Sequence, residues 1–273
     1  MKINKGFNYL TLASVLWGTI GIAVQFSYKA GGNSIGMVGF RTLFSLIVTI
    51  FLLDRRMLFR RESIIMGLVS GLFYETYTFA ITIDGAPLSS FLLYTAPIFV
   101  AVISFGLVKE RITSRKVAAI FIVIFALYLE YLGTPTFYQV FWGLMSGLTY
   151  GMLISFSKYL QTKDYREIDI LGVQSFWSSI LVFPLLLLNR DTISLPSLLG
   201  GVYLAVLGTI IPYYFFYKGI KYADSTIATV ITALEPVVTT ILSLPLLGEG
   251  LTGYQLIGSV LILLCAIWLS ISV

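Results

Sequence analysis

The segments "APIFVAVISFGLVKERIT" (residues 96–113) and "EPVVTTILSLPLLGEGLT" (residues 235–252) are similar to each other along their whole length. Pro97 aligns with Pro236, and Glu110 aligns with Glu249, at one offset of 139 residues. Upstream, "LWG" at 16–18 resembles "TYG" at 149–151 at an offset of 133. We therefore predict two homologous units, residues 1–134 and residues 135–273, joined in one compact domain.

The composition indicates that lipid, not water, surrounds this domain. The 273 residues are 58% hydrophobic and 11% charged, whereas a soluble domain carries about 25% charged residues. A helix needs about 20 apolar residues to cross a bilayer. Ten stretches qualify, near 6–27, 35–53, 63–83, 87–108, 114–132, 137–157, 168–188, 198–217, 225–247 and 253–272. The sequence predicts an all-α polytopic membrane protein with ten transmembrane helices.

The two predicted units run in opposite directions through the membrane. Each unit has five helices, and because five is odd, the second unit starts on the opposite face from the first. The basic residues support this path: fifteen of the 18 Lys and Arg fall on connections to one side, and only Lys29 and Arg190 fall on the other. Basic connections stay in the cytoplasm. We expect two inverted repeats in a prokaryotic cell membrane, with both termini cytoplasmic and no affinity for nucleic acid.

Several classes of chemistry are disfavoured by the residues that the chain lacks. It contains no histidine and a single cysteine, Cys265. His-based catalytic triads and the usual zinc and haem sites are therefore excluded. The predicted spans hold no pair of aspartates and no serine beside a lysine. We expect no metal, no cofactor and no enzymatic activity. An intramembrane enzyme or a scaffold is the less favoured alternative.

Three ionisable residues lie well inside predicted spans: Arg41, Glu75 and Glu235. Each costs roughly 2.5–3.5 kcal/mol at the centre of a membrane helix. Such residues face the protein interior and are functional candidates by default. We predict that Glu75 and Glu235 exchange protons, and that Arg41 orients an anionic group of a substrate. A permanent salt bridge between Arg41 and Glu75 is the alternative.

Polar and aromatic side chains accompany these charges at helical spacing. Rings with polar tips suit a cavity for an amphipathic solute, although any one of them can simply pack against its neighbours. "GLMSGLTYG" at 143–151 places three glycines on one helix face, which predicts close helix packing. The predicted cavity residues are Trp17, Arg41, Tyr74, Glu75, Thr78, Tyr94, Tyr150, Tyr213, Tyr217, Thr232 and Glu235.

Three prolines fall in the middle of predicted spans: Pro97, Pro212 and Pro236. A proline inside a helix lacks an N–H and leaves the carbonyl four residues earlier without its usual donor. The three freed carbonyls would belong to Leu93, Gly208 and Thr232. We predict that the prolines act as hinges and offer backbone groups to the cavity. Static kinking for packing is the alternative.

Four segments together resemble the EamA-type modules of the drug/metabolite transporter superfamily. They are "VLWGTIGIA" (15–23), "VGFRTLFSLIVTIFLL" (38–53), "FAITIDGAPLSSFLLYTAPIF" (79–99) and "LEPVVTTILSLPLLGEGLTGYQLIGSVLILL" (234–264). The resemblance covers both units. It implies ten helices, cytoplasmic termini, a central cavity lined by the first four helices of each repeat, and export of amino acids, other metabolites or drugs. Glu75 is not part of the family pattern.

The expected activity is secondary active transport by alternating access, driven by protons. One interior cation beside two acids favours a small zwitterion or an amine, because a phosphate carrier would need several interior cations. Amino acids or amines are thus the expected substrates, moved outward. The alternatives are a drug or multidrug transporter, or a nucleotide-precursor transporter, of the same fold. The other partners are protons and membrane lipids, and the chain acts as a monomer or as a homodimer through its last helix.

Overall fold

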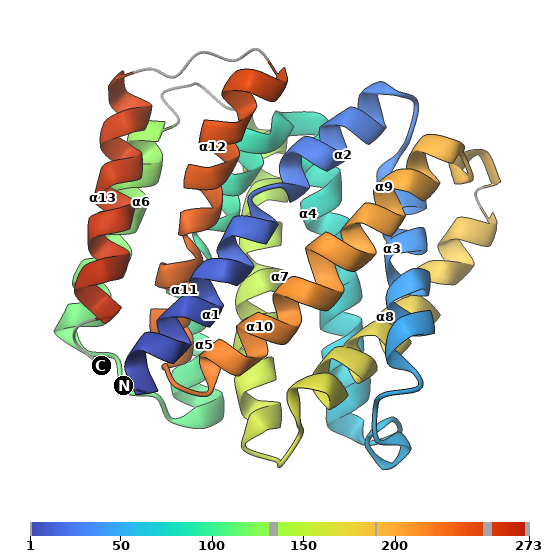
Figure 1. Cartoon of the computed structure of the whole chain (residues 1–273), viewed down its shortest axis with the longest axis horizontal. Helices are drawn as coiled ribbons and strands as arrows, with labels where there is room; N and C mark the ends of the chain where they lie inside the picture. The colour runs from blue at the N-terminus through green and yellow to red at the C-terminus, as the bar shows by residue number, and fades with distance from the viewer. Residues whose placement is uncertain (1, 131–135, 189, 248–252, 271–273) are drawn as a thin grey trace.

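The computed structural model describes residues 2–130, 136–188, 190–247 and 253–270. Within these ranges every regular element is a helix, and the helices form ten membrane spans (Figure 1). Five spans are single helices: α3 (Ser34–Thr49), α6 (Ser114–Glu130), α7 (Phe137–Gln161), α8 (Glu167–Leu188) and α13 (Gly253–Ser270). Short 3₁₀ turns follow α3 at Arg55–Met57 and α8 at Arg190–Thr192.

The other five spans are interrupted or share a helix. The first consists of α1 (Lys2–Trp17) and α2 (Ile20–Lys29). The eighth consists of α9 (Leu195–Ala205), the π-helical segment η3 (Val206–Ile210) and α10 (Ile211–Ile220), and the ninth consists of α11 (Ser225–Thr232) and α12 (Leu234–Leu247). The third is the first part of α4 (Arg61–Leu93), and the fourth combines the end of α4 with α5 (Ala96–Val108). These breaks position backbone groups inside the molecule.

The connection between the third and fourth spans lies at Gly85, inside the bounds of α4. Gly85 has a non-helical φ of 79° and ψ of 168° that breaks the helix between the spans expected at 63–83 and 87–108. This left-handed φ is readily adopted only by glycine. Pro87 follows at once, near the start of the next helical part. The interruption of the fourth span instead lies at Tyr94 and Thr95, just before Pro97.

Helices of the two repeats pack against one another throughout the centre of the molecule. The long helix α4 lies along α7 and α8, α3 lies along α8 and α9, and α1 lies along α10. In Figure 1, α6 and α13 form a separate pair at one side. The start of α1 and the end of α13 are at the same end of the molecule. The first four spans of each repeat thus surround the interior.

Close packing of α7 against the fourth span is confirmed at the predicted glycines. A Cβ added to Gly143 would overlap Leu92 Cδ1, and one added to Gly147 would lie 2.5 Å from Thr95 Oγ1. At Gly151 the added atom would lie 2.8 Å from Phe99 Cβ. Side chains at these positions would push α7 away from the interruption at Tyr94 and Thr95.

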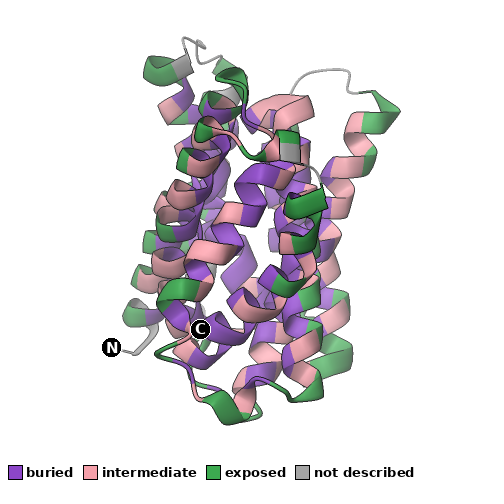
Figure 2. Ribbon diagram, turned by 90° about the vertical axis from the view of Figure 1, so that its right-hand side faces the viewer, coloured by how far each residue is buried: buried purple, intermediate pink, exposed green. Residues whose placement is uncertain are grey.

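The distribution of burial fits a protein surrounded by lipid. Figure 2 shows buried residues along the inner faces of the helices and exposed residues along the outer faces and at the ends. Many exposed side chains are large and apolar, such as Phe121, Phe125 and Leu264. Six described helical stretches are long and apolar enough to cross a membrane, and three shorter apolar helices accompany them. The protein is an integral, multi-pass membrane protein.

Candidate functional site

Glu235 lies at the centre of the molecule, where the ninth span is interrupted. It is the second residue of α12 and is 2% exposed. Its Oε1 accepts a hydrogen bond from the Tyr77 hydroxyl and its Oε2 accepts one from the Tyr94 hydroxyl, both at 2.8 Å. Glu235 belongs to the second repeat and both tyrosines belong to the first. This buried carboxylate therefore joins the two repeats.

Arg41 provides the positive charge of the same region. It is 1% exposed on α3. Its Nε donates to Thr209 Oγ1 at 2.7 Å, and its Nη2 donates to the carbonyl oxygen of Gly208 at 3.0 Å. The guanidinium carbon lies 3.8 Å from the centre of the Tyr74 ring, a cation–π contact. The Nη1 atom is buried and has no hydrogen-bond partner among the described residues.

The carbonyl that binds Arg41 lacks its usual hydrogen-bond donor within the helix. Gly208 precedes Pro212 by four residues, and Pro212 lacks the N–H that would normally bind this carbonyl. The π-helical segment η3 spans the same residues. The Gly208 oxygen also accepts a hydrogen bond from Trp17 Nε1 at 3.2 Å. One backbone group of the second repeat thus holds two side chains of the first.

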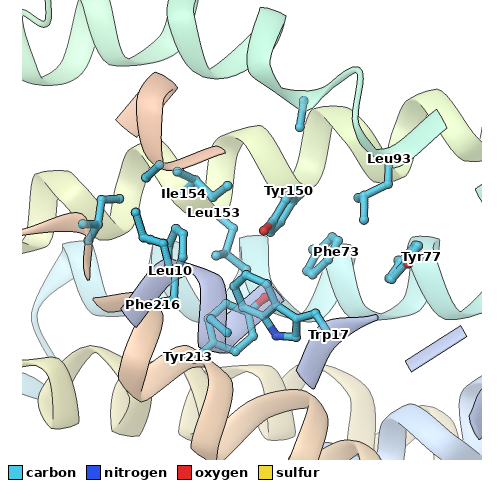
Figure 3. Close-up of a cluster of buried hydrophobic side chains, with 14 of the residues drawn as sticks. Leu10, Trp17, Phe73, Tyr77, Leu93, Tyr150, Leu153, Ile154, Tyr213 and Phe216 are labelled. Atoms are coloured by element: carbon cyan, nitrogen blue, oxygen red, sulfur yellow. The ribbon is translucent and has the colours of Figure 1, made fainter. Parts of the chain in front are cut away.

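Arg41 and Glu235 line one small central cavity. Its walls are Trp17, Ile20, Arg41, Phe73, Tyr77, Leu93, Tyr150, Tyr213 and Glu235. Figure 3 shows several of these rings converging from different helices. The space that a water molecule can enter is about 10 Å³, room for about one water molecule. Pockets for small molecules usually measure roughly 300–1,000 Å³. The structure thus corresponds to a closed arrangement of this site.

An aromatic cluster and an amide surround the cavity. The Trp17 ring packs against Tyr213 with centroids 5.0 Å apart, and the Phe73 ring stacks on Tyr150 at 4.9 Å. Behind this wall, Gln174 Nε2 donates to the Tyr74 hydroxyl, and the Tyr217 hydroxyl donates to Gln174 Oε1. The hydroxyl of Tyr150 is buried without a partner in the described part of the chain. The wall is apolar, with a few polar atoms that face inward.

The predicted cavity residues occupy three kinds of position. Trp17, Arg41, Tyr150, Tyr213 and Glu235 line the cavity itself. Tyr74, Tyr94 and Tyr217 form the layer that contacts these residues. Thr232 is buried just before the interruption, and its hydroxyl donates to the carbonyl of Thr229 at 3.0 Å. Thr78 is buried, and its hydroxyl is unpaired among the described residues.

Glu75 has a different environment from Glu235. It lies on α4 and does not line the central cavity. Its Oε2 is buried and lacks a hydrogen-bond partner within the described chain. The alternative salt bridge with Arg41 is absent among the described residues, because Arg41 binds Gly208 and Thr209 instead. Of the two glutamates that were predicted to line the cavity, only Glu235 therefore does so.

Each of the three predicted hinge prolines follows an interruption of its span. Pro97 and Pro212 lie in the first turns of α5 and α10, and Pro236 is the third residue of α12. Proline is well tolerated at these positions because the first N–H groups of a helix have no partner inside it. Pro97 and Pro236 therefore begin half-helices, whereas Pro212 follows η3 within a continuous run of helical residues. Their role as hinges stays a prediction.

Sequence reasoning missed three polar residues of the site, Tyr77, Gln174 and Thr209. It also missed three apolar residues of the cavity lining, Ile20, Phe73 and Leu93. Tyr77 lies two residues after Glu75, and its contact with Glu235 crosses between the repeats. Gln174 occupies the position equivalent to Arg41 at the offset of 133 that "LWG" and "TYG" define. Matching Arg41 through this offset indicates Gln174 as a second polar residue at the same depth in the membrane. Thr209 had no comparable signal.

A second carboxylate contact joins the repeats at the basic end of the molecule, which is the end where most of the Lys and Arg residues of the connections lie. Glu110 accepts hydrogen bonds from the backbone N–H and the hydroxyl of Ser225, each at 2.9 Å. Beside it, Lys116 Nζ lies 2.7 Å from Asp224 Oδ2. These bonds bind the end of the fourth span to the start of α11. The equivalent residue in the second repeat, Glu249, lies outside the described residues.

Comparisons with known proteins agree with this architecture. The sequence model of the EamA-like transporter family matches residues 4–132 and again residues 137–271. An uncharacterized transporter of Archaeoglobus fulgidus is 28% identical over 93% of this chain and 92% of its own length. The uncharacterized inner membrane transporter YicL of Salmonella typhimurium is 24% identical over 98% and 95%, respectively.

A solved structure shares the fold. This crystal structure has a TM-score of 0.75 and covers 96% of this chain and 94% of its own, at 17% sequence identity. At that identity the likeness concerns the arrangement of helices. The two matches of the family model coincide with the two sets of five spans.

Proposed function

Because the chain belongs to the EamA-like transporter family, we propose that it is a secondary transporter of small amines or amino acids. Glu235 and Arg41 are the charged groups of its binding site. One observation carries this proposal: two opposite charges, one from each repeat, line a single buried cavity. A zwitterion presents an ammonium and a carboxylate that match these charges.

The chemistry of the lining supports a small organic cation or zwitterion. The Glu235 carboxylate can bind an ammonium group, and the aromatic faces of Trp17 and Tyr150 suit a cation as well. The unpaired Nη1 of Arg41 is a donor for a carboxylate. Among the described residues, Arg41 is the one cationic side chain of the cavity lining, which suits a single carboxylate better than a phosphate. The substrate enters only after the cavity widens.

Alternating access requires the two repeats to move around this cavity. The proposed moving units are residues 1–134 and residues 135–273. The interruptions at Gly18–Thr19, Tyr94–Thr95 and Ala233, together with η3, surround the cavity and provide places where half-helices can tilt. The prolines that begin α5, α10 and α12 are the proposed hinges. Opening toward the basic end, which we assign to the cytoplasm, would break the Glu110–Ser225 contact.

Transport is coupled to protons if Glu235 can bind a proton or the substrate, but not both at the same time. A protonated carboxyl is neutral and leaves the ammonium group without its counter-charge. Proton uptake from outside would then release the substrate there, and the empty protonated site would return. This exchange moves the substrate outward and protons inward. The relatives of this chain come from an archaeon and a bacterium, which supports a prokaryotic cell membrane.

Counterflow in proteoliposomes tests the proposal. The purified chain is reconstituted, loaded with an unlabelled mixture of amino acids and amines, and supplied with radiolabelled members of the set. An imposed pH gradient should drive accumulation of the transported members. Glu235→Gln should abolish the response to the gradient, because the amide cannot carry a proton, whereas Glu62→Gln, at the first turn of α4, should not. Gradient-driven accumulation that persists in Glu235→Gln would refute the assignment of Glu235.

A further inference from the structure

The hydroxyl of Tyr77 lies between two acceptors in different parts of the molecule. It donates to Glu235 Oε1 at 2.8 Å and lies 3.3 Å from Ser90 Oγ. Tyr77 is in α4 before the turn at Gly85, and Ser90 is in α4 after that turn. Glu235 is in α12 of the other repeat. This one hydroxyl can therefore bind either across the repeats or within its own helix.

The two acceptors suit different protonation states of Glu235. An ionised carboxylate only accepts hydrogen bonds, and its two oxygens bind Tyr77 and Tyr94. A protonated carboxyl carries one O–H group, so one of its oxygens becomes a donor. If the proton binds Oε1, the new carboxyl O–H can donate to the Tyr77 oxygen. The O–H of Tyr77 must then turn to another acceptor.

We propose that Tyr77 is the positioning residue that makes this exchange: its O–H turns from Glu235 to Ser90 when Glu235 takes up a proton. The proposal rests on the proposed function of Glu235 as the proton site. Tyr77 already lies within hydrogen-bond distance of a second acceptor, Ser90 Oγ, at 3.3 Å. The incoming proton binds a carboxylate oxygen, no other covalent bond changes, and Tyr77 keeps its own proton.

The exchange has a consequence for the contact between the repeats. Before protonation, Tyr77 and Tyr94 both bind α12 to the first repeat. Afterwards the O–H of Tyr77 donates to Ser90, and the bond across the repeats runs from the neutral carboxyl to the Tyr77 oxygen. Proton uptake thus replaces a hydrogen bond to a charged carboxylate by a weaker one between neutral groups at the interruption of the ninth span. This weakens the closed state at the position where the half-helices meet.

The other ionisable groups around Glu235 keep their protonation states when Tyr77 changes its acceptor. Tyr94, Tyr150 and Arg41 face it from the α4–α5 junction, α7 and α3. Arg41 is held by Thr209 and Gly208 and is protonated at any physiological pH. The phenols titrate far above neutral pH. Glu235 is accordingly the group whose charge changes, and Tyr77 responds to it.

Infrared titration of the reconstituted protein tests the exchange without any substrate. The probe is the proton itself: the carboxyl C=O band is followed against pH and assigned by its loss in Glu235→Gln. Tyr77→Phe should move the midpoint about one unit to higher pH, because a hydrogen bond to the carboxylate is stronger than one to a neutral hydroxyl. Ser90→Ala should move it about half a unit to lower pH, because Tyr77 loses its second acceptor.

Variants with matched chemistry complete the test. Ser90→Thr keeps a hydroxyl and should keep the midpoint of the parent protein. Tyr203→Phe, which removes a hydroxyl that binds Thr19, should also leave it unchanged. In the Tyr77→Phe background, Ser90→Ala should have no further effect, because the two act on one hydrogen bond.

Two results would overturn the inference, and they have different meanings. If Glu235→Gln removes no band, Glu235 is not the proton site, and both the exchange and the proton coupling fail. If the band is present but Tyr77→Phe and Ser90→Ala leave its midpoint in place, or shift it additively, only the exchange fails.

Discussion

Glu235 and Glu75 are two glutamates inside the membrane with opposite environments. Each oxygen of Glu235 accepts a hydrogen bond from a buried tyrosine, whereas Oε2 of Glu75 is buried without a partner in the described chain. A buried carboxylate needs such donors to remain charged. Glu235 is thus equipped to alternate between charged and neutral forms, and Glu75 is better suited to stay neutral. Glu235 is also fully buried, whereas Glu75 is only partly buried.

Replacing each glutamate by leucine should give the largest contrast. Glu235→Leu removes the acceptor of the Tyr94 hydroxyl and leaves Tyr77 only its longer contact with Ser90, and an unsatisfied buried group costs about 1–3 kcal/mol. With the weakened Tyr77 bond, we expect a loss of about 2–4 kcal/mol in the free energy of unfolding. Glu75→Leu should be neutral or stabilising, because it removes an unpartnered polar atom. Thermal unfolding of both variants in one detergent measures the difference, and equal losses would contradict the comparison.

The next largest effect is expected at Arg41, the cation of the cavity. Arg41→Lys cannot reproduce the separate bonds to Thr209 and Gly208, because an ammonium is a single point of charge. The affinity for solutes that carry a carboxylate should fall about 10- to 100-fold, equivalent to about 1.4–3 kcal/mol. Amines without a carboxylate serve as the control and should be affected less. Concentration dependence of uptake gives both values, and an equal loss for both solute classes would contradict this role.

A third carboxylate, at the basic end of the molecule, extends the comparison to a group that caps a helix. Glu110→Gln weakens the contact with the N-terminus of α11, which is worth about 1 kcal/mol by analogy with other caps. A state open at that end should become about fivefold more populated. A cysteine at Thr229, in a chain where Cys265 is alanine, should then react faster with an impermeant maleimide. A slower or unchanged reaction would show that this contact does not hold that end closed.

The smallest effect is expected for Glu75→Gln. If Glu75 stays protonated, the amide is a close substitute, and transport driven by a pH gradient should change less than twofold. The sequence analysis predicted that Glu75 also exchanges protons, and this variant decides between the two interpretations. Loss of the response to the gradient would restore Glu75 to the coupling mechanism. Initial rates of uptake at several imposed gradients provide the measurement.

Much of the architecture could be predicted from the sequence. Apolar length gives the ten spans, because the bilayer sets how many residues cross it. The prolines at 97, 212 and 236 mark where spans are interrupted, since a proline cannot donate to the preceding turn. The glycines in "GLMSGLTYG" indicate the close contact of α7 with the fourth span. These features depend on residues that lie close together in the sequence.

The partners of the buried charges could not be predicted in the same way. Helical spacing indicates which residues share a face, but not which helix of the other repeat that face meets. The contact of Tyr77 with Glu235 joins positions 158 residues apart, and no periodic pattern connects them. The difference between Glu75 and Glu235 arises from such contacts between helices.

The most direct test of the account is proton release on substrate binding. The solubilised protein is placed in weak buffer with a pH indicator, below the midpoint at which Glu235 titrates, and the solute found by counterflow is added. The account predicts release of about one proton per chain by linkage, absent in Glu235→Gln and retained in Glu75→Gln. Equal release from the parent protein and Glu235→Gln would contradict it.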